Sequence, residues 1–253
     1  MIDFAPLIVF GVLLVRIGMV VALTPVFGGT WAPAQIKVGL TVVLAAMLAP
    51  LVPLPAIENP AALAAIVAHE SVIGLALSMG IRVLVAAAEL GGYLVGFQVG
   101  FSYAGIVDPQ SGVRNNVLAV LYSSLALLAV FGANLHHQML RLLVATYDAV
   151  PVAAHGGVNQ SLVESVMRLT GGIFVLGAEL AAPVVLVLVL VEVVMGVVSR
   201  AAPSLNLMVV GAPIRLLVGL FALSGALEVV PGVITRSATM SLELASRLAM
   251  AFK

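Results

Sequence analysis

The side chains of this chain that could do chemistry are two histidine-containing pairs. His69 and Glu70 begin the run AHESV, but a zinc-protease motif would need a second histidine at position 73, which is Ile73. His136 and His137 are adjacent, so on a helix their side chains would point about 100° apart, and no nearby carboxylate completes a metal site. We therefore predict no metal centre, and we expect His136 and His137 at helix ends or interfaces.

Charged side chains inside or at the ends of apolar runs are the second group. They are Arg16, Glu70, Arg82, Glu89, Glu179, Glu192 and Arg200. A charge at the centre of a membrane helix costs ~2.5–3.5 kcal/mol, so each is expected to have a partner. We interpret them as structural pairs between helices, and the alternative is a proton or ion relay. Arg82 and Glu89 lie about 10.5 Å apart along a helix axis, so each needs a partner elsewhere.

Other kinds of chemistry find no support in the sequence. No Walker, Rossmann or G-x-S-x-G pattern occurs, and the absence of cysteine removes disulfides and thiolate chemistry. Eleven basic and eleven acidic residues cancel without forming a basic stripe, so nucleic-acid binding has no electrostatic basis. We predict no enzymatic activity, no catalytic residues, no cofactor and no nucleic-acid partner.

The elements that position these residues must be apolar. Apolar residues make up 62% of the chain and charged residues 9%, whereas soluble domains have about 45–50% and about 25%. Such a chain cannot cover itself with a charged surface, so it is predicted to be embedded in a membrane or enclosed in a hydrophobic assembly. The N-terminus carries Asp3 rather than a basic region, and Arg16 interrupts the apolar run that follows, so we expect the first apolar segment to be retained rather than cleaved as a signal peptide.

Long apolar segments alternate with loops rich in proline and glycine. Six segments cover roughly residues 4–24, 37–54, 61–90, 115–147, 162–200 and 205–230, and a shorter amphipathic helix is predicted at 237–252. Segments of ~20 residues suit membrane helices, and strand-like alternation is absent. The sequence predicts an all-α, multi-helix, membrane-associated protein in which residues 1–253 form a single domain. Basic residues are spread over almost every connection, so the membrane orientation stays open.

Two local features are predicted in more detail. Asn59 before Pro60 is typical of a helix N-cap followed by proline at the first helical position. In the helix at 237–252, Glu243 and Arg247 can pair at i, i+4. The apolar face of that helix is predicted to contain Met240, Leu244, Leu248 and Ala251 and to lie on a membrane surface or on a partner.

The segment 71–90 is marginal as a lone membrane helix. Inserting its strongly apolar residues into a membrane is favourable by roughly 3–6 kcal/mol, and the cost of inserting Arg82 and Glu89 cancels most of that free energy. We therefore expect this segment to pack against other protein rather than against lipid.

A glycine ladder follows this segment. Gly92, Gly96 and Gly100 are four residues apart on one helix face, a spacing that lets backbones approach closely in membranes. Asp108 and Pro109 then form a predicted turn that can reverse the chain. The apolar cluster just before the turn consists of Phe101, Tyr103, Ile106 and Val107.

The order and spacing of these features resemble the FliR family, the flagellar member of the type III secretion export gate, whose injectisome counterparts form the SctT group. The resemblance covers most of the chain, from about Arg16 to Leu220. It rests on Arg16, Pro25, Phe27, Glu70, Gly74, the glycine ladder, Phe101 to Ala104, Asp108-Pro109, His136, Tyr147, Pro151, Pro183, Gly196, Arg200, Pro203, Asn206, Gly211 and Pro213.

This resemblance implies a non-enzymatic structural subunit built from long helical hairpins. One copy would pack with P-type and Q-type gate subunits (FliP and FliQ) in a hetero-oligomeric helical assembly, with FlhB and FlhA as further partners. The assembly would form the entrance channel for unfolded export substrates in the bacterial inner (cell) membrane, at the flagellar basal body. The family's plug loop falls at about Gly100 to Asn116, where Tyr103 and Ile106 replace phenylalanines of many relatives.

Two other functions remain open at this point. The chain could be the equivalent subunit of a virulence injectisome, which the genes beside it would reveal. It could also be a small-molecule or ion transporter that uses the charges in its apolar segments. A transporter should function alone or as a homo-oligomer, whereas a gate subunit should purify with unlike partners.

Overall fold

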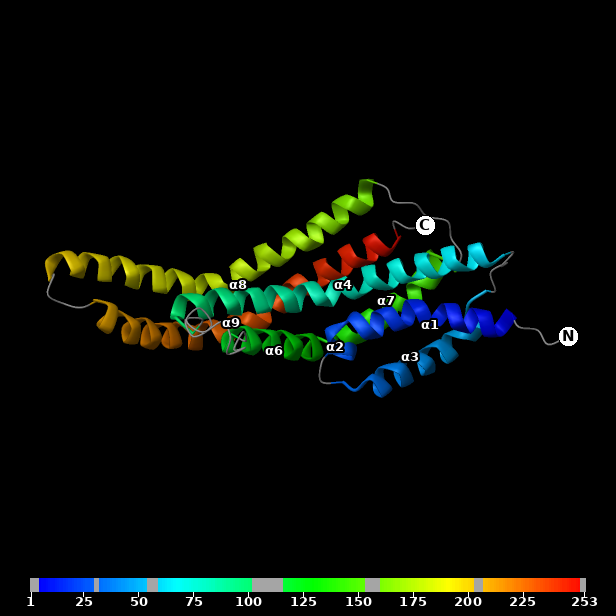
Figure 1. Cartoon of the computed structure of the whole chain (residues 1–253), viewed down its shortest axis with the longest axis horizontal. Helices are drawn as coiled ribbons and strands as arrows, with labels where there is room; N and C mark the ends of the chain where they lie inside the picture. The colour runs from blue at the N-terminus through cyan, green and yellow to red at the C-terminus, as the bar shows by residue number, and fades with distance from the viewer. Residues whose placement is uncertain are drawn as a thin grey trace. The chain divides into compact units, whose positions relative to one another are not determined.

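The computed structural model describes residues 5–29, 32–53, 59–101, 116–152, 160–202 and 207–250. Within these ranges the chain is helical and contains no strand (Figure 1). The all-α prediction is confirmed. Long runs of alanine, leucine and valine favour helices here because in lipid every backbone N–H and C=O group must find its partner within the segment.

Nine helical elements follow one another along the described ranges. They are α1 (Ala5–Leu23), α2 (Pro25–Gly28), α3 (Ala34–Leu48), the 3-10 turn η1 (Ala49–Leu51), α4 (Pro60–Val99), α6 (Val117–Gly132), α7 (Leu135–Ala149), α8 (Gln160–Ala201) and α9 (Leu207–Met250). By length and composition, four spans could cross a membrane: α3 with η1, α4, α8 and α9. The broken pair of α6 and α7 would make a fifth.

The chain divides into two compact units. The first contains Met1–Val83, Val130–Gly171 and Ala238–Lys253, and the second contains Leu84–Ala129 and Gly172–Ser237. Because α4, α8 and α9 contribute residues to both units, neither unit is a separate stretch of chain. The single domain over residues 1–253 remains a prediction.

Helix α4 is the most enclosed of the four candidate spans. In its most apolar window 67% of the residues are buried, against 11% to 28% in the other three. This agrees with the prediction that the segment 71–90 packs against protein. Glycines allow part of this packing: a Cβ added at Gly91 would lie 2.9 Å from the carbonyl oxygen of Gly177 on α8.

Helix boundaries follow local chemistry in two places. The amide of Ala62 donates to Asn59 Oδ1 at 2.8 Å, so the predicted N-cap of α4 is confirmed. The apolar segment predicted at 115–147 is broken after Gly132, where Asn134 adopts a left-handed conformation with φ 56°. Asparagine tolerates that conformation better than most residues, which explains why the chain can turn there.

The C-terminal helix differs from its prediction. Helix α9 continues without a break to Met250, so a separate helix at 237–252 was wrong. Near residue 237 the sequence becomes richer in charged side chains, which suggested a new helix. No glycine, proline or cap ends the backbone helix at that point. The predicted pair of Glu243 and Arg247 is confirmed at 2.7 Å.

Of the predicted apolar face of this helix, Leu248 is buried within the chain and Met240 is exposed, so the packing of this face on a membrane or a partner remains a prediction. Small side chains allow a close approach to α4, where a Cβ added at Gly80 would lie 3.1 Å from Ala245 Cβ. The buried face consists of Ala238, Ser241, Leu242, Ala245, Leu248 and Ala249.

Candidate functional site

The most unusual site in the first unit is a fully buried ion pair between α1 and α4. Arg16 Nε donates to Glu70 Oε2 at 2.6 Å, and Arg16 Nη2 donates to Glu70 Oε1 at 2.8 Å. Neither side chain is exposed to solvent. The two parallel bonds match the planar fork of the guanidinium to the carboxylate, the geometry in which such a pair is strongest.

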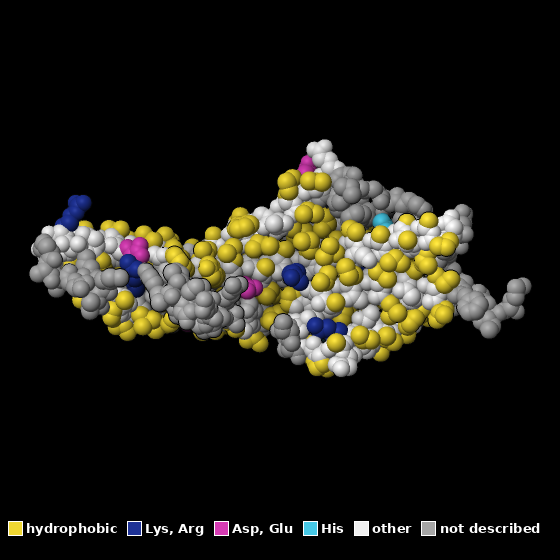
Figure 2. Space-filling model, viewed as in Figure 1, with side chains coloured by type: hydrophobic (Ala, Val, Ile, Leu, Met, Phe, Trp, Pro, Cys, Tyr) yellow, Lys and Arg dark blue, Asp and Glu magenta, His cyan; other side chains and the backbone are white. Residues whose placement is uncertain are grey.

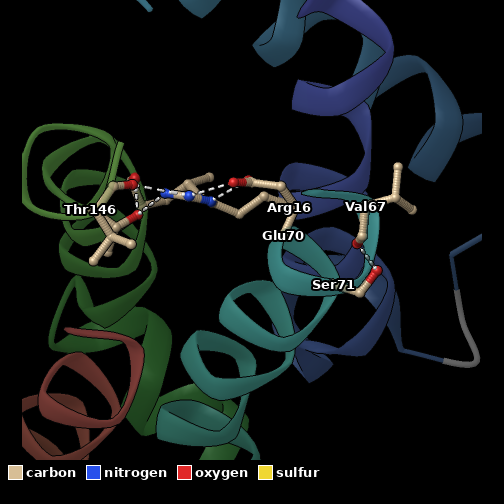
Figure 3. Close-up of polar contacts among 7 residues, drawn as sticks. Arg16, Val67, Glu70, Ser71 and Thr146 are labelled. Atoms are coloured by element: carbon tan, nitrogen blue, oxygen red, sulfur yellow. Dashed lines mark hydrogen bonds and ion pairs between the residues drawn. The ribbon is translucent and has the colours of Figure 1, made fainter. Parts of the chain in front are cut away.

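The rest of the guanidinium is held by α7. Nη1 of Arg16 donates to Thr146 Oγ1 at 3.3 Å, and Nη2 donates to the carbonyl oxygen of Val150 at 3.1 Å. Figure 3 shows the guanidinium extending from Glu70 on one side to Thr146 on the other. The ring of Tyr147 lies 4.2 Å from Arg16 Cζ, a cation–π contact. Because Val150 follows the last turn of α7, the positive charge also faces the negative end of that helix dipole.

Close helix contact brings this pair together. Gly74 lies one turn after Glu70 on α4, and a Cβ added there would lie 2.7 Å from the carbonyl oxygen of Arg16 and 2.7 Å from Met19 Cβ. Ile17, next to Arg16, is fully buried. Helices α1 and α4 therefore approach nearly backbone to backbone, which brings the side chains of Arg16 and Glu70 within bonding distance.

The chemistry of this site is structural. Arginine stays protonated in proteins, so a pair of Arg16 with Glu70 is poorly suited to passing protons. It is well suited to linking α1, α4 and α7, since each of the four hydrogen bonds of Arg16 joins two different helices or a helix and the residue after a helix end. This favours the structural-pair interpretation of these two charges over the relay.

A second charged pair lies in the other unit. Arg215 on α9 lies 3.4 Å from Glu192 Oε1 on α8, and Gln98 Nε2 on α4 donates to the same oxygen at 3.2 Å. The sequence analysis named Glu192 but missed Arg215 and Gln98. Arg215 had the same signal, a charge within an apolar run, and should have been included with the others.

The other four charged residues named in the sequence analysis form no ion pair within the described part of the chain. Arg82 is exposed and reaches the carbonyl oxygen of Leu23 at 3.4 Å. Glu89, Glu179 and Arg200 are exposed as well. These four side chains lie on helices long enough to cross a membrane.

The glycine ladder has two structural roles. A Cβ at Gly92 would overlap the backbone of Leu118 and Ala119 on α6, and one at Gly96 would overlap the carboxamide of Asn116. Gly100 instead follows the end of α4 with φ 105°, a conformation that other residues rarely adopt. The first two glycines thus allow the start of α6 to pack closely against α4, and the third ends α4.

Asn116 joins the ladder to α6. Its Oδ1 accepts from the amide of Leu118 at 3.0 Å, as a helix N-cap does, and its Nδ2 donates to the carbonyl oxygen of Tyr93 at 3.1 Å. The side chain therefore ties the start of α6 to the last turns of α4. Sequence analysis missed Asn116, although an asparagine just before an apolar run is a helix-start signal.

The predicted plug loop is described only at its first apolar residue. Phe101 follows Gly100 and is exposed. The other predicted residues lie outside the described ranges, namely Tyr103, Ile106, Val107, Asp108 and Pro109.

The adjacent histidines lie at a helix end, as predicted. His136 and His137 lie in the first turn of α7, and their ring centroids are 4.1 Å apart. Among the described residues, no group of three or more potential ligands is arranged to hold a metal ion.

The long apolar helices define an all-α membrane protein. Its helices are held together by the buried Arg16–Glu70 pair and by close contacts at glycines. The sequence model of the family described as "Bacterial export proteins, family 1" matches residues 7–240. The chain belongs to this family, that of the FliR proteins, and is a component of a type III export apparatus.

Individual relatives agree with this assignment. The chain is 30% identical over 219 residues to the flagellar biosynthetic protein FliR of Pectobacterium carotovorum subsp. carotovorum, which covers 86% of this chain and 83% of the relative. It is 26% identical over 237 residues to FliR of Bacillus subtilis (strain 168), covering 92% of both chains. It is also 26% identical over 151 residues to the Yop proteins translocation protein T of Yersinia pestis, covering 59% of this chain and 58% of that one.

Proposed function

We propose that the chain is a non-enzymatic structural subunit of the flagellar type III export gate in the bacterial inner membrane, at the basal body. With P-type and Q-type subunits (FliP and FliQ) it forms the entrance channel for unfolded substrates, and FlhB and FlhA are further partners. The observation that carries this proposal is the family match over residues 7–240, nearly the whole chain.

Exposed apolar helices support the assembly part of this proposal. In the most apolar window of α8 only 17% of the residues are buried within the chain. Figure 2 shows apolar side chains spread along the described part of the face in view, with few charged ones among them. In the proposed gate, sister subunits cover part of this apolar surface. The large exposed residues of α8 include Phe174, Val175, Leu186, Leu190, Val193 and Val197.

Co-expression with P-type and Q-type subunits tests the proposal. We expect a stable hetero-complex that contains one copy of this chain, because its apolar surface needs partners to bury it. Native mass spectrometry of the detergent-solubilised complex gives the composition directly. A monodisperse and fully stable monomer would contradict the proposal, and a homo-oligomer that transports ions would favour the transporter instead.

A plug role for the loop after α4 is part of the same proposal. An apolar constriction can block ions by dewetting, and the aromatic and aliphatic residues from Phe101 to Val107 have suitable side chains. The family resemblance and the exposed Phe101 at the loop's start support this role.

Removing Gly105 to Gly112 is expected to leave the complex assembled but leaky to ions. Ion conductance of the purified complex in a planar bilayer measures the leak. A glycine–serine segment of unchanged length serves as the matched control, since it removes apolar side chains without shortening the loop. Unchanged conductance in both variants with intact assembly would exclude the plug, and loss of assembly would indicate a packing role.

The similarity to the Yop proteins translocation protein T of Yersinia pestis supports a second candidate, the equivalent subunit of a virulence injectisome. Deleting the gene distinguishes the two. Loss of motility with normal effector secretion indicates the flagellar system, and the reverse result indicates the injectisome.

A further inference from the structure

One carboxylate of the second unit, Glu89, lines a pocket and has no partner among the residues that the structure describes. The pocket has a volume of about 310 Å³ and lies between α4 and α6. Its lining includes Glu89, Tyr93 and Asn116, together with the small apolar side chains of Ala86, Ala119 and Val120. Glu89 is exposed, and within the described ranges it makes no hydrogen bond or ion pair.

A carboxylate without a partner would be costly inside a membrane. Glu89 lies within α4, one of the helices long and apolar enough to cross a membrane. Such carboxylates usually pair with another group. The nearest polar wall of the pocket, Asn116, already bonds to Tyr93 and Leu118. Glu192 differs from Glu89 in this respect, because its carboxylate pairs with Arg215 of the same chain.

Aromatic side chains continue from Glu89 along the same face of α4. Tyr93 and Phe97 follow at four-residue spacing on α4 and are 49% and 53% exposed, and Phe101, which is 43% exposed, lies just beyond the end of the helix. Exposed aromatics are typical of protein interfaces, where they bury a large area at low entropic cost. Lipid could cover the rings, but lipid tails would leave the carboxylate unpaired.

We infer that the pocket and this aromatic stripe form a docking surface for a helix of a neighbouring export-gate subunit that carries a lysine or arginine. The basic side chain enters the pocket and pairs with Glu89, and its apolar neighbours pack on Phe97 and Phe101. Tyr93 is placed to stack against the cation. This inference rests on the proposed function, because it requires a partner subunit.

Photo-crosslinking in the assembled complex tests where this surface lies. The photoreactive analogue benzoylphenylalanine replaces Tyr93 or Phe97, both of which are aromatic and exposed. We expect each to crosslink to a partner subunit, to a peptide that contains a lysine or arginine. The same analogue at Phe221, exposed on α9 in the same unit, controls for random labelling. Crosslinks only to lipid or within this chain would overturn the inference.

Charge reversal tests the role of Glu89. We expect Glu89→Lys to reduce the yield of the hetero-complex roughly tenfold or more, because like charges then meet at the interface. Glu89→Gln keeps the shape and is expected to reduce the yield less. Glu179→Lys is the matched control, since it reverses an exposed carboxylate of the same unit that does not line the pocket.

Rescue identifies the partner charge. Changing the crosslinked lysine or arginine to glutamate is expected to restore assembly with Glu89→Lys and to weaken it with the unchanged chain. A normal yield with Glu89→Lys would overturn the docking surface while leaving the proposed function intact. If the unchanged chain forms no complex at all, both fail. If Glu89→Lys does not fold alone, the crosslinks at Tyr93 and Phe97 decide.

Discussion

Replacing Arg16 with alanine is expected to lower the free energy of unfolding by about 3–5 kcal/mol, because Glu70 would remain charged and buried without a partner. Thr146 and the carbonyl oxygen of Val150 would lose their donor as well. Glu70→Ala should be similarly damaging, since it leaves the guanidinium uncompensated. Arg16→Lys cannot restore the paired bonds, because an ammonium lacks the planar fork.

Thermal unfolding in detergent, followed by loss of helical signal and by yield, measures this effect. Arg168→Ala is the matched control, because the exposed pair of Arg168 and Glu164 is 4.0 Å apart and should contribute no more than about 1 kcal/mol. The double variant Arg16→Met with Glu70→Met should be less damaged than either single variant, since no unpaired charge remains. Equal effects of Arg16→Ala and Arg168→Ala would contradict a structural role.

Gly96→Leu is expected to destabilise the second unit by about 2–5 kcal/mol and to weaken assembly. The first carbon of the new side chain would already occupy the position of the Asn116 carboxamide. Overpacking of this kind typically costs about 1–3 kcal/mol, and displacing Asn116 also loses the cap of α6, worth about 0.5–2 kcal/mol.

Gly225→Leu provides the control for this variant. It lies on α9 in the same unit, and a Cβ there would meet nothing within 4 Å. Thermal stability of the chain and yield of the complex should fall for Gly96→Leu only. The pair Gly96→Ala and Asn116→Ala should be less than additive, because removing the carboxamide makes room for the methyl group. Normal stability and yield with Gly96→Leu would show that this contact is not a packing face.

Features that depend on neighbouring residues could be predicted from the sequence. Asn59 before Pro60 correctly predicted a helix start, and the spacing of Glu243 and Arg247 correctly predicted an i, i+4 ion pair. The marginal hydropathy of residues 71–90 indicated that α4 needs protein around it, and α4 is the most enclosed candidate span. In each case the physical cause lies within one helix, so a window of sequence contains the information.

Features that depend on distant residues could not be predicted. Arg16 and Glu70 are separated by 54 residues, and nothing in the pattern of charges says which of seven will meet. The pairing is decided by where α1 and α4 touch, at Gly74. The ladder shows the same limit: equal spacing predicted one role for three glycines, whereas Gly100 differs in backbone conformation.

The hydrogen bonds of Arg16 also constrain the order of events during synthesis and membrane insertion. Arg16 emerges from the ribosome early, and the carbonyl oxygen that it binds at Val150 is synthesised 134 residues later. At about 5–20 residues per second, roughly 7–27 s pass between the two. During that interval α1 carries a cation that lipid accepts poorly, so the helix is expected to stay beside the insertion machinery until α4 and then α7 arrive to release it.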